Sequence, residues 1–284
     1  MRFSEDRIEK LTCSDGIQRD IHIWEPDKPR AVFLTIHGGM DHGGNYILPA
    51  LYLKKHNMAT VVHDQHGHDR QEKVHIPNFE VFLDDVELMI AWVKEHYSGL
   101  PIFVLTHSMG GLVAAHFVIR RLEEEPLIKG FIMSSPYFVN AIKAPWIVKK
   151  LAGILSALTP KMAVPIEDLL VHVTHDEEVY KRHRQDERDH IMADKVSARF
   201  ANELLKAQAW ISGNIAKWNR PLLAIVAGDD KLANADATRQ FLGQIKPDLI
   251  TELYYPENYH ENFNELNRDE IFGEIVKWVE ARIS

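Results

Sequence analysis

The 284-residue sequence is poor in cysteine and has no long apolar run. Its single cysteine, Cys13, has no second thiol to pair with, which excludes an internal disulfide. No apolar stretch reaches the length of a bilayer-spanning helix, and residues 1–7 lack the apolar core of a secretory signal. We therefore expect a cytoplasmic protein, an expectation that is compatible with peripheral attachment to a membrane.

Acidic residues outnumber basic residues in this chain. The 33 Lys and Arg stand against 41 Asp and Glu, which gives a formal net charge of -8. Because phosphate backbones repel an acidic protein, nucleic acid is not expected as a partner. Internal repeats and low-complexity segments are also absent. The length is sufficient for a substantial core, either as one large α/β domain or as a domain with a small insert.

Short apolar runs alternate with segments of helical periodicity. This alternation predicts an α/β fold in which helices flank both faces of a mostly parallel central sheet. Ligands of such sheets bind beyond the carboxyl ends of the strands, so the residues that follow each run are candidates for a site. After an N-terminal hairpin, the predicted buried strands are residues 31–36, 59–63, 102–105, 130–133, 222–226 and 250–255.

Residues 136–219 interrupt this alternation, because they contain several helical segments and no clear buried strand. We expect a helical cap, inserted before the last two strands. The chain would then divide into a first core part (1–135), the cap (136–219) and a second core part (220–284). The charged stretch 176–189 within the cap is typical of a solvated helix face.

Ser108 lies between a predicted strand and a predicted helix, in the hexapeptide T-H-S-M-G-G at 106–111. A strand, a tight turn with a serine at its tip and a helix form the context of a nucleophile elbow. The helix that begins there directs its first backbone N–H groups, and the positive end of its dipole, towards the serine. Gly110 and Gly111 allow close approach of strand and helix. Thr106 occupies the first glycine position of the usual G-x-S-x-G pattern.

Backbone donors for an oxyanion are predicted in two turns. The glycine-rich turn after the first buried strand contains Gly39, whose N–H can be directed at the elbow. The N–H of Met109, directly after the serine, would be the second donor. A plain tight turn at Gly39 is the alternative interpretation.

Candidates for an acid and a base follow the last two strands. Asp229 and Asp230 come after the fifth strand, and position alone does not decide between them. His260 lies after the last strand and ahead of the last helix, within reach of Ser108 across the top of the sheet. The order Ser, Asp, His along the chain is that of the α/β-hydrolase arrangement.

Other histidines are less specific signals among the 16 in the chain. His107 is interpreted as a packing or hydrogen-bonding neighbour of the elbow. The grouping of imidazoles and carboxylates at 63–69 resembles a metal site, yet its spacing fits no zinc signature. We therefore expect neither a metal nor a cofactor. The residues in that grouping are His63, Asp64, His66, His68 and Asp69.

An apolar stripe at near-helical spacing lies in the predicted cap. A helix packed on the domain is one explanation, and a lid that lines an acyl-binding tunnel is the other. In the second case the stripe binds substrate and makes transient contact with a membrane surface. The candidate substrate-binding residues are Trp146, Ile147, Leu151 and Leu155.

Together these segments resemble the monoacylglycerol lipase and lysophospholipase branch of the α/β-hydrolases, a family that includes serine aminopeptidase-like members. The resemblance covers nearly the whole chain. The stretch Y-H-E-N-F-N-E at 259–265 is the most specific match, to the family motif Y-H-E-x-x-N-E. Further matches are H-G-G-M-D-H-G-G-N-Y at 37–46, D-Q-H-G-H-D at 64–69, T-H-S-M-G-G at 106–111 and A-G-D-D-K-L at 227–232.

The resemblance implies a serine hydrolase that uses Ser108, His260 and Asp230, since the register of the acid motif favours Asp230 over Asp229. It also implies a cap that admits one acyl chain with a small polar head. The expected partner is a small acyl ester or lipid, specifically a monoacylglycerol or a lysophospholipid. The alternatives are a short-chain esterase, a thioesterase or an amidase of this fold, and an inactive binding module. The sequence does not indicate an oligomeric state.

The chain departs from the family motifs at several positions. None of the departures removes a reacting group, but together they leave the identity of the substrate open. The replaced positions are Met40, Asp41, Gly43, Asn45, His66, Asp69, Thr106 and Ala227.

Overall fold

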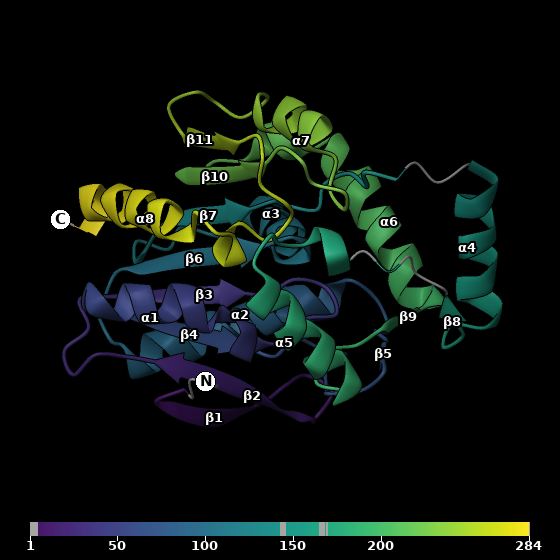
Figure 1. Cartoon of the computed structure of the whole chain (residues 1–284), viewed down its shortest axis with the longest axis horizontal. Coiled ribbons are helices and arrows are strands. Elements are labelled where there is room, and N and C mark those ends of the chain that lie inside the picture. The colour runs from purple at the N-terminus through teal and green to yellow at the C-terminus, as the bar shows by residue number, and fades with distance from the viewer. Residues whose placement is uncertain (1–4, 143–145, 165–167, 169, 284) are drawn as a thin grey trace.

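An eight-stranded sheet in the order β1-β2-β4-β3-β6-β7-β10-β11 forms the centre of the molecule (Figure 1). The computed structural model describes residues 5–142, 146–164, 168 and 170–283, and for 146–151 the backbone alone. β2 pairs antiparallel with β1 and β4, and the other neighbours are parallel. The strands are β1 (Arg7–Thr12), β2 (Gln18–Trp24), β3 (Ala31–Ile36), β4 (Met58–His63), β6 (Ile102–His107), β7 (Ile128–Ser134), β10 (Leu222–Ala227) and β11 (Ile250–Tyr255).

Helices cover both faces of this sheet, which confirms the predicted mostly parallel α/β architecture. Alternate side chains of β3 enter different cores because successive residues of a strand point to opposite faces. Val32 and Leu34 join the core beneath α2 and α3. Phe33 joins the core beneath α1 and α8. The helices are α1 (Ile47–Lys55), α2 (Glu80–His96), α3 (Met109–Arg120), α7 (Ala235–Leu242) and α8 (Arg268–Ile283), with short 3-10 turns η1 (Gly43–Tyr46), η2 (Leu170–His172), η3 (Ile215–Lys217) and η4 (Asn262–Asn264).

The last strand differs from the prediction of a buried strand. β11 pairs only with β10 and is the edge of the sheet, so its side chains are half-buried or exposed. Tyr254, for example, is 41% exposed. Its apolar residues lie on both faces but are only partly covered: Ile250 packs against one core, and Leu253 and Tyr255 pack against the other.

The described residues between β7 and β10 form three α-helices and two short strands. α4 (Trp146–Leu158) lies apart from the central sheet and packs beside α6 (Ala198–Ser212), whereas α5 (Glu177–Arg188) lies nearer the sheet (Figure 1). β8 (Ala163–Val164) and β9 (Lys195–Ser197) form a small sheet with β5 (Lys73–Val74). The sequence did not predict this second sheet, because strands of two or three residues carry no periodic signal. In the described part of the chain, no helix combines the length and apolar character needed to span a bilayer.

The parallel arrangement brings distant loops together at one edge of the sheet. β3, β4, β6, β10 and β11 all end at this edge, because parallel strands share their carboxyl end. The residues that follow these strands are His37, Asp64, Ser108, Gly228 and Pro256. The predicted site residues all lie in the loops that begin there, except those of α4.

Candidate active site

Ser108 occupies a strained turn between β6 and α3. Its φ of 51° and ψ of -118° lie outside the regions that a non-glycine residue ordinarily adopts. The turn is held because the Ser108 N–H donates to Ser134 O at 3.0 Å and Ser108 O accepts from Gly111 N at 2.9 Å. Such strain persists only where the surrounding structure over-determines it, and it is typical of functional sites. This geometry is that of a nucleophile elbow.

Two glycines after the serine are required by close packing. A Cβ on Gly110 would lie 2.1 Å from Ile36 O, and one on Gly111 would lie 2.8 Å from Pro136 Cβ. The first contact is with backbone, which cannot move aside easily. α3 therefore begins directly against the end of β3, a neighbour that the sequence did not identify for these two glycines.

Thr106 is accommodated in the elbow by a hydrogen bond. Its Oγ1 donates to Ile132 O on the neighbouring strand at 3.2 Å, and the side chain is fully buried. A Cβ on Gly111 would lie 3.6 Å from the same Oγ1, which is an ordinary contact distance. The threonine thus fills the first glycine position without preventing the left-handed conformation of the serine.

Asp230 orients His260. Its Oδ2 accepts a hydrogen bond from Nδ1 of His260 at 2.6 Å, and its Oδ1 accepts from the backbone N–H groups of Leu232 and Ala233. Asp229, by contrast, forms an exposed ion pair with Lys231. The geometry therefore selects Asp230 as the carboxylate in contact with the histidine.

The second nitrogen of the His260 ring is available for proton transfer. Nε2 is buried and makes no hydrogen bond among the described residues. The ring lies 4.7 Å, centroid to centroid, from that of His107, which directly precedes Ser108. Burial lowers the pKa of His260, but the charge and hydrogen bond of Asp230 outweigh it, so the pKa is raised above 6.5. The arrangement suits a general base with a stabilised protonated form.

The glycine-rich turn after β3 lies against the elbow. A Cβ on Gly38 would be 3.5 Å from Ser108 Cβ, and one on Gly39 would be 3.6 Å from Met109 Sδ. The two predicted backbone donors, at Gly39 and Met109, are thus neighbours across the site. Phe200 from α6 is also close, at 3.8 Å from the Gly39 position.

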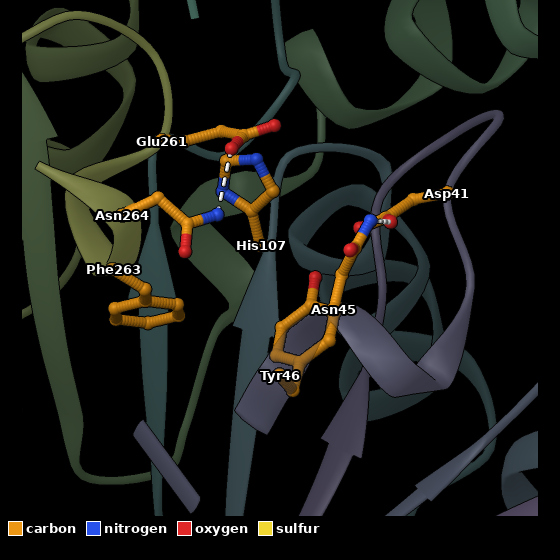
Figure 2. A pocket seen from close by; sticks show the side chains of 7 residues that line it. All are labelled: Asp41, Asn45, Tyr46, His107, Glu261, Phe263 and Asn264. Carbon is orange, nitrogen blue, oxygen red and sulfur yellow. Dashed lines mark hydrogen bonds between the residues drawn. The ribbon is translucent and has the colours of Figure 1, made fainter. Parts of the chain in front are cut away.

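A polar pocket lies beside His107 (Figure 2). Its free space is about that of one water molecule. Burial raises the pKa of Asp41. Burial also acts to raise the pKa of Glu261, but the ion pair with His183 outweighs it and lowers that pKa to about 2. The lining residues are Asp41, Asn45, Tyr46, His107, Glu261, Phe263 and Asn264.

Helix α5 contacts the loop that carries His260. His183 donates from Nε2 to Glu261 at 2.8 Å, and the Glu261 N–H donates to Val173 O at 2.8 Å. His183 and Asp186 are buried, so the prediction that residues 176–189 form a solvated face is wrong for one side of α5. The helical spacing of Val179, His183 and Asp186 was the available signal. It was missed because the stretch is charged overall.

The candidate substrate-binding residues lie on α4. The side chains of Trp146, Ile147 and Leu151 lie outside the described residues. Leu155 is half-buried, and Leu158, further along the same helix, is 76% exposed. The contacts of the predicted stripe with substrate remain a prediction.

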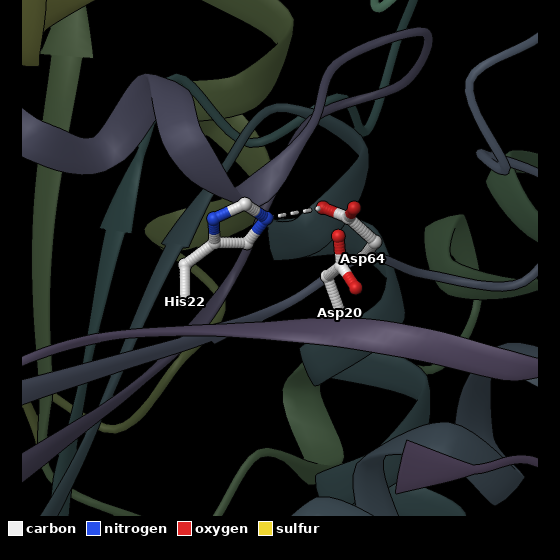
Figure 3. Close-up of side chains that lie close together, drawn as sticks. All are labelled: Asp20, His22 and Asp64. Atoms are coloured by element: carbon white, nitrogen blue, oxygen red, sulfur yellow. Dashed lines mark ion pairs between the residues drawn. The ribbon is translucent and has the colours of Figure 1, made fainter. Parts of the chain in front are cut away.

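The histidine-rich loop after β4 begins with Asp64, which pairs with His22 of β2. Among the described residues, the one group with suitable ligand spacing is Asp20, His22 and Asp64 (Figure 3). His22 lies between two carboxylates, with Nδ1 2.6 Å from Glu5 and Nε2 3.3 Å from Asp64. Burial opposes its protonation, but these partners raise its pKa to about 9. The raised pKa favours the protonated imidazole, which pairs with both carboxylates.

Comparison with known proteins agrees with this fold. The sequence profile of the serine aminopeptidase S33 family matches residues 27–267. The chain is 30% identical to phospholipase YtpA of Bacillus subtilis, over 88% of this chain and 95% of the relative. It is 27% identical to the monoglyceride lipase of Homo sapiens, over 97% of this chain and 91% of the relative.

Solved structures share the fold. A soluble variant of the monoglyceride lipase from Saccharomyces cerevisiae, in complex with a substrate analogue, superposes with a TM-score of 0.81 at 18% identity, covering 100% of this chain and 97% of that one.

The chain also matches the sequence of an uncharacterised abhydrolase domain-containing protein of Dictyostelium discoideum, of whose length it spans 29%.

The fold and the elbow define an α/β-hydrolase of lipase and esterase type. The chain belongs to the serine aminopeptidase S33 family, and within it resembles the monoacylglycerol lipases.

Proposed function

We propose that the protein is a serine hydrolase that cleaves carboxylic esters of lipid-like substrates through an acyl-enzyme. The observation that carries this proposal is the strained turn at Ser108, where the ring of the preceding His107 lies 4.7 Å from that of His260, whose Nδ1 is hydrogen-bonded to the buried Asp230. This arrangement supports the assignment of Ser108 as nucleophile, His260 as base and Asp230 as orienting carboxylate.

The reaction proceeds in two similar steps. Nε2 of His260 takes the proton of the Ser108 hydroxyl as Oγ attacks the ester carbonyl. The backbone N–H groups of Gly39 and Met109 donate to the resulting oxyanion. The bond to the alcohol then breaks and the proton passes from Nε2 to the leaving oxygen. Water, deprotonated by the same nitrogen, attacks the acyl-enzyme, and the acid is released.

The surroundings of Ser108 support an amphiphilic substrate. Phe200 and Met109 present apolar surface on one side of the Gly38–Gly39 turn. Asp41 and Glu261 line the small polar pocket beside His107, and Glu261 is ionised. An ionised carboxylate near the site repels a phosphate headgroup, so its charge favours a substrate with a neutral glycerol head over a lysophospholipid. A monoacylglycerol is therefore the substrate that we favour.

We also assign residues 136–219 as a cap over this site. Phe200 on α6 and His183 on α5 both reach the loops around Ser108, which supports the assignment. α4 lies further out, and its exposed Ile154 and Leu158 offer apolar surface to an acyl chain or a membrane. Transient membrane contact through α4 belongs to the same proposal.

Labelling with a fluorophosphonate probe tests the nucleophile. The wild type and Ser135→Ala should be labelled, because Ser135, although also left-handed, bonds Asn262. Ser108→Ala should remain folded but resist labelling, and its hydrolysis of acyl esters should fall on the order of 10⁶-fold. An unlabelled, inert wild type would instead indicate a binding module.

A substrate panel tests the ester class. We expect monoacylglycerols of one range of chain length to exceed lysophospholipids in kcat/KM. The same acyl group presented as a thioester, an amide or a short-chain ester is the matched comparison. Preference for one of those compounds would replace the lipid assignment with the corresponding esterase, thioesterase or amidase activity.

A further inference from the structure

Two buried histidines form hydrogen bonds with the backbone of the glycine-rich turn after β3. His68 lies in the loop after β4, and its Nε2 accepts a hydrogen bond from the Met40 N–H at 3.0 Å. Its Nδ1 is 3.1 Å from His66 O, an acceptor, so Nδ1 carries the proton and Nε2 has the free lone pair. His68 is 4% exposed, and its ring packs between Phe82 and Phe200.

His37 holds the adjoining peptide. Its Nε2 accepts from the Gln65 N–H at 2.9 Å, so its Nδ1 donates to Gly38 O at 2.7 Å. In a trans peptide the C=O and N–H groups point in opposite directions. Fixing Gly38 O towards His37 therefore directs the Gly39 N–H away from that ring.

Both peptides that flank Gly39 are thus bound by imidazoles. The Gly38–Gly39 peptide is held through its carbonyl, and the Gly39–Met40 peptide is held through its N–H. The two rings support each other edge to face, with centroids 4.9 Å apart. This support matters because consecutive glycines are the most flexible backbone, and Met40 has a left-handed φ of 63°.

We propose that His68 is a positioning residue of the oxyanion turn: by accepting the Met40 N–H, it fixes the peptide that follows Gly39, while His37 fixes the peptide that carries the Gly39 N–H. The inference rests on the proposed function, because it gives Gly39 the role of a donor. His68 itself does not touch the substrate. Without its acceptor, the Gly39–Met40 peptide can rotate, Gly39 is then held on one side alone, and its N–H is less well positioned for the oxyanion.

The test uses three substitutions of similar size. His68→Met and His68→Phe remove the acceptor, whereas His68→Gln retains an acceptor oxygen at about the distance of Nε2. His116→Phe is the matched control, because this buried histidine donates to Ala207 O and has no recorded hydrogen bond to the turn. The measurements are kcat, KM, and the inhibition constant of an alkylboronic acid, which forms a tetrahedral adduct with the serine.

We expect His68→Met and His68→Phe to lose about 10²-fold in kcat, with KM nearly unchanged. Boronic acid affinity should weaken by a similar factor, since the adduct uses the same donors as the transition state. His68→Gln should recover at least about tenfold in both quantities. A merely structural role would instead change the melting temperature and leave the ratio of boronate affinity to KM unaltered.

Three outcomes would overturn the proposal. They are a rate of His68→Phe equal to that of His116→Phe, an absence of rescue by glutamine, and failure of both acceptor-free variants to fold, which would make His68 a structural residue. Failure of the proposed function is distinguishable, because the wild type would then hydrolyse no ester and Ser108 would remain unlabelled.

Discussion

The Oδ2 of Asp230 lies 2.6 Å from Nδ1 of His260, although the two residues are 30 positions apart. Asp230 also accepts two backbone hydrogen bonds, so the position of its carboxylate does not depend on the histidine ring alone. This contact orients the imidazole with Nε2 free and stabilises its protonated form. The first prediction concerns this pair.

Asp230→Asn should reduce kcat by about 10⁴-fold, because an amide stabilises the wrong tautomer of His260 and cannot stabilise its charge. Asp229→Asn is the matched control and should retain most of the activity, since Asp229 is exposed and pairs with Lys231. Steady-state kinetics on one ester would measure both. Equal losses in the two variants would contradict the assignment of the acid.

The pH dependence of hydrolysis should report the protonation of His260. The base must be neutral to accept the serine proton, so kcat/KM should fall as the pH decreases through the raised pKa of this residue. Asp230 raises that pKa above 6.5, and the midpoint should therefore lie above 6.5. In Asp230→Asn the midpoint should move to lower pH. An unmoved midpoint would show that another group controls the rate.

Gly110→Ala should destabilise the protein by about 3 kcal/mol, because the new methyl group would meet Ile36 O at 2.1 Å. Gly273→Ala on α8 is the control. Its methyl group would lie 3.7 Å from the nearest atom, Tyr52 Oη, so alanine should be neutral or up to about 1 kcal/mol stabilising. Urea unfolding of the two variants and the wild type measures both changes. Similar values for the two would contradict the packing argument.

His22 should make stability depend on pH. Its pKa is about 9 in the folded protein and 6.5 ordinarily, so the folded state binds more protons between these values. Its contribution to the free energy of unfolding is complete below about 6.5 and is lost as the pH rises through about 9. The decline over this window should therefore be shallower in His22→Gln.

The control for that experiment is His190→Asn. The side chain of His190 is 55% exposed, and asparagine tolerates its left-handed φ of 54°. The slope of stability against pH should remain that of the wild type. NMR titration of His22 gives an independent measure, and a midpoint near 6.5 would contradict its ion pairs with Glu5 and with Asp64, the second of which is drawn in Figure 3.

Much of the architecture could be predicted from local patterns. The buried runs of β3, β6 and β10 were evident because fully covered parallel strands are apolar at nearly every position. The elbow was evident from Ser108 and the nearby Gly110 and Gly111, since only small residues allow a helix to start so close to a strand. The edge position of β11 was not evident, because the pairing of a strand depends on its neighbours in space.

The sequence by itself determined the α/β class, the elbow at Ser108 and the loops in which its partners had to lie. These features depend on residue type and short-range spacing, which a linear pattern contains. Only the tertiary structure decided which contacts form: Asp230 with His260, His183 with Glu261, and His68 with the Met40 N–H. Each of these joins segments far apart in the chain, and parallel strands bring them together at one edge. A buried histidine in a polar loop looks the same in sequence as a solvated one, because its burial is a property of the surrounding fold.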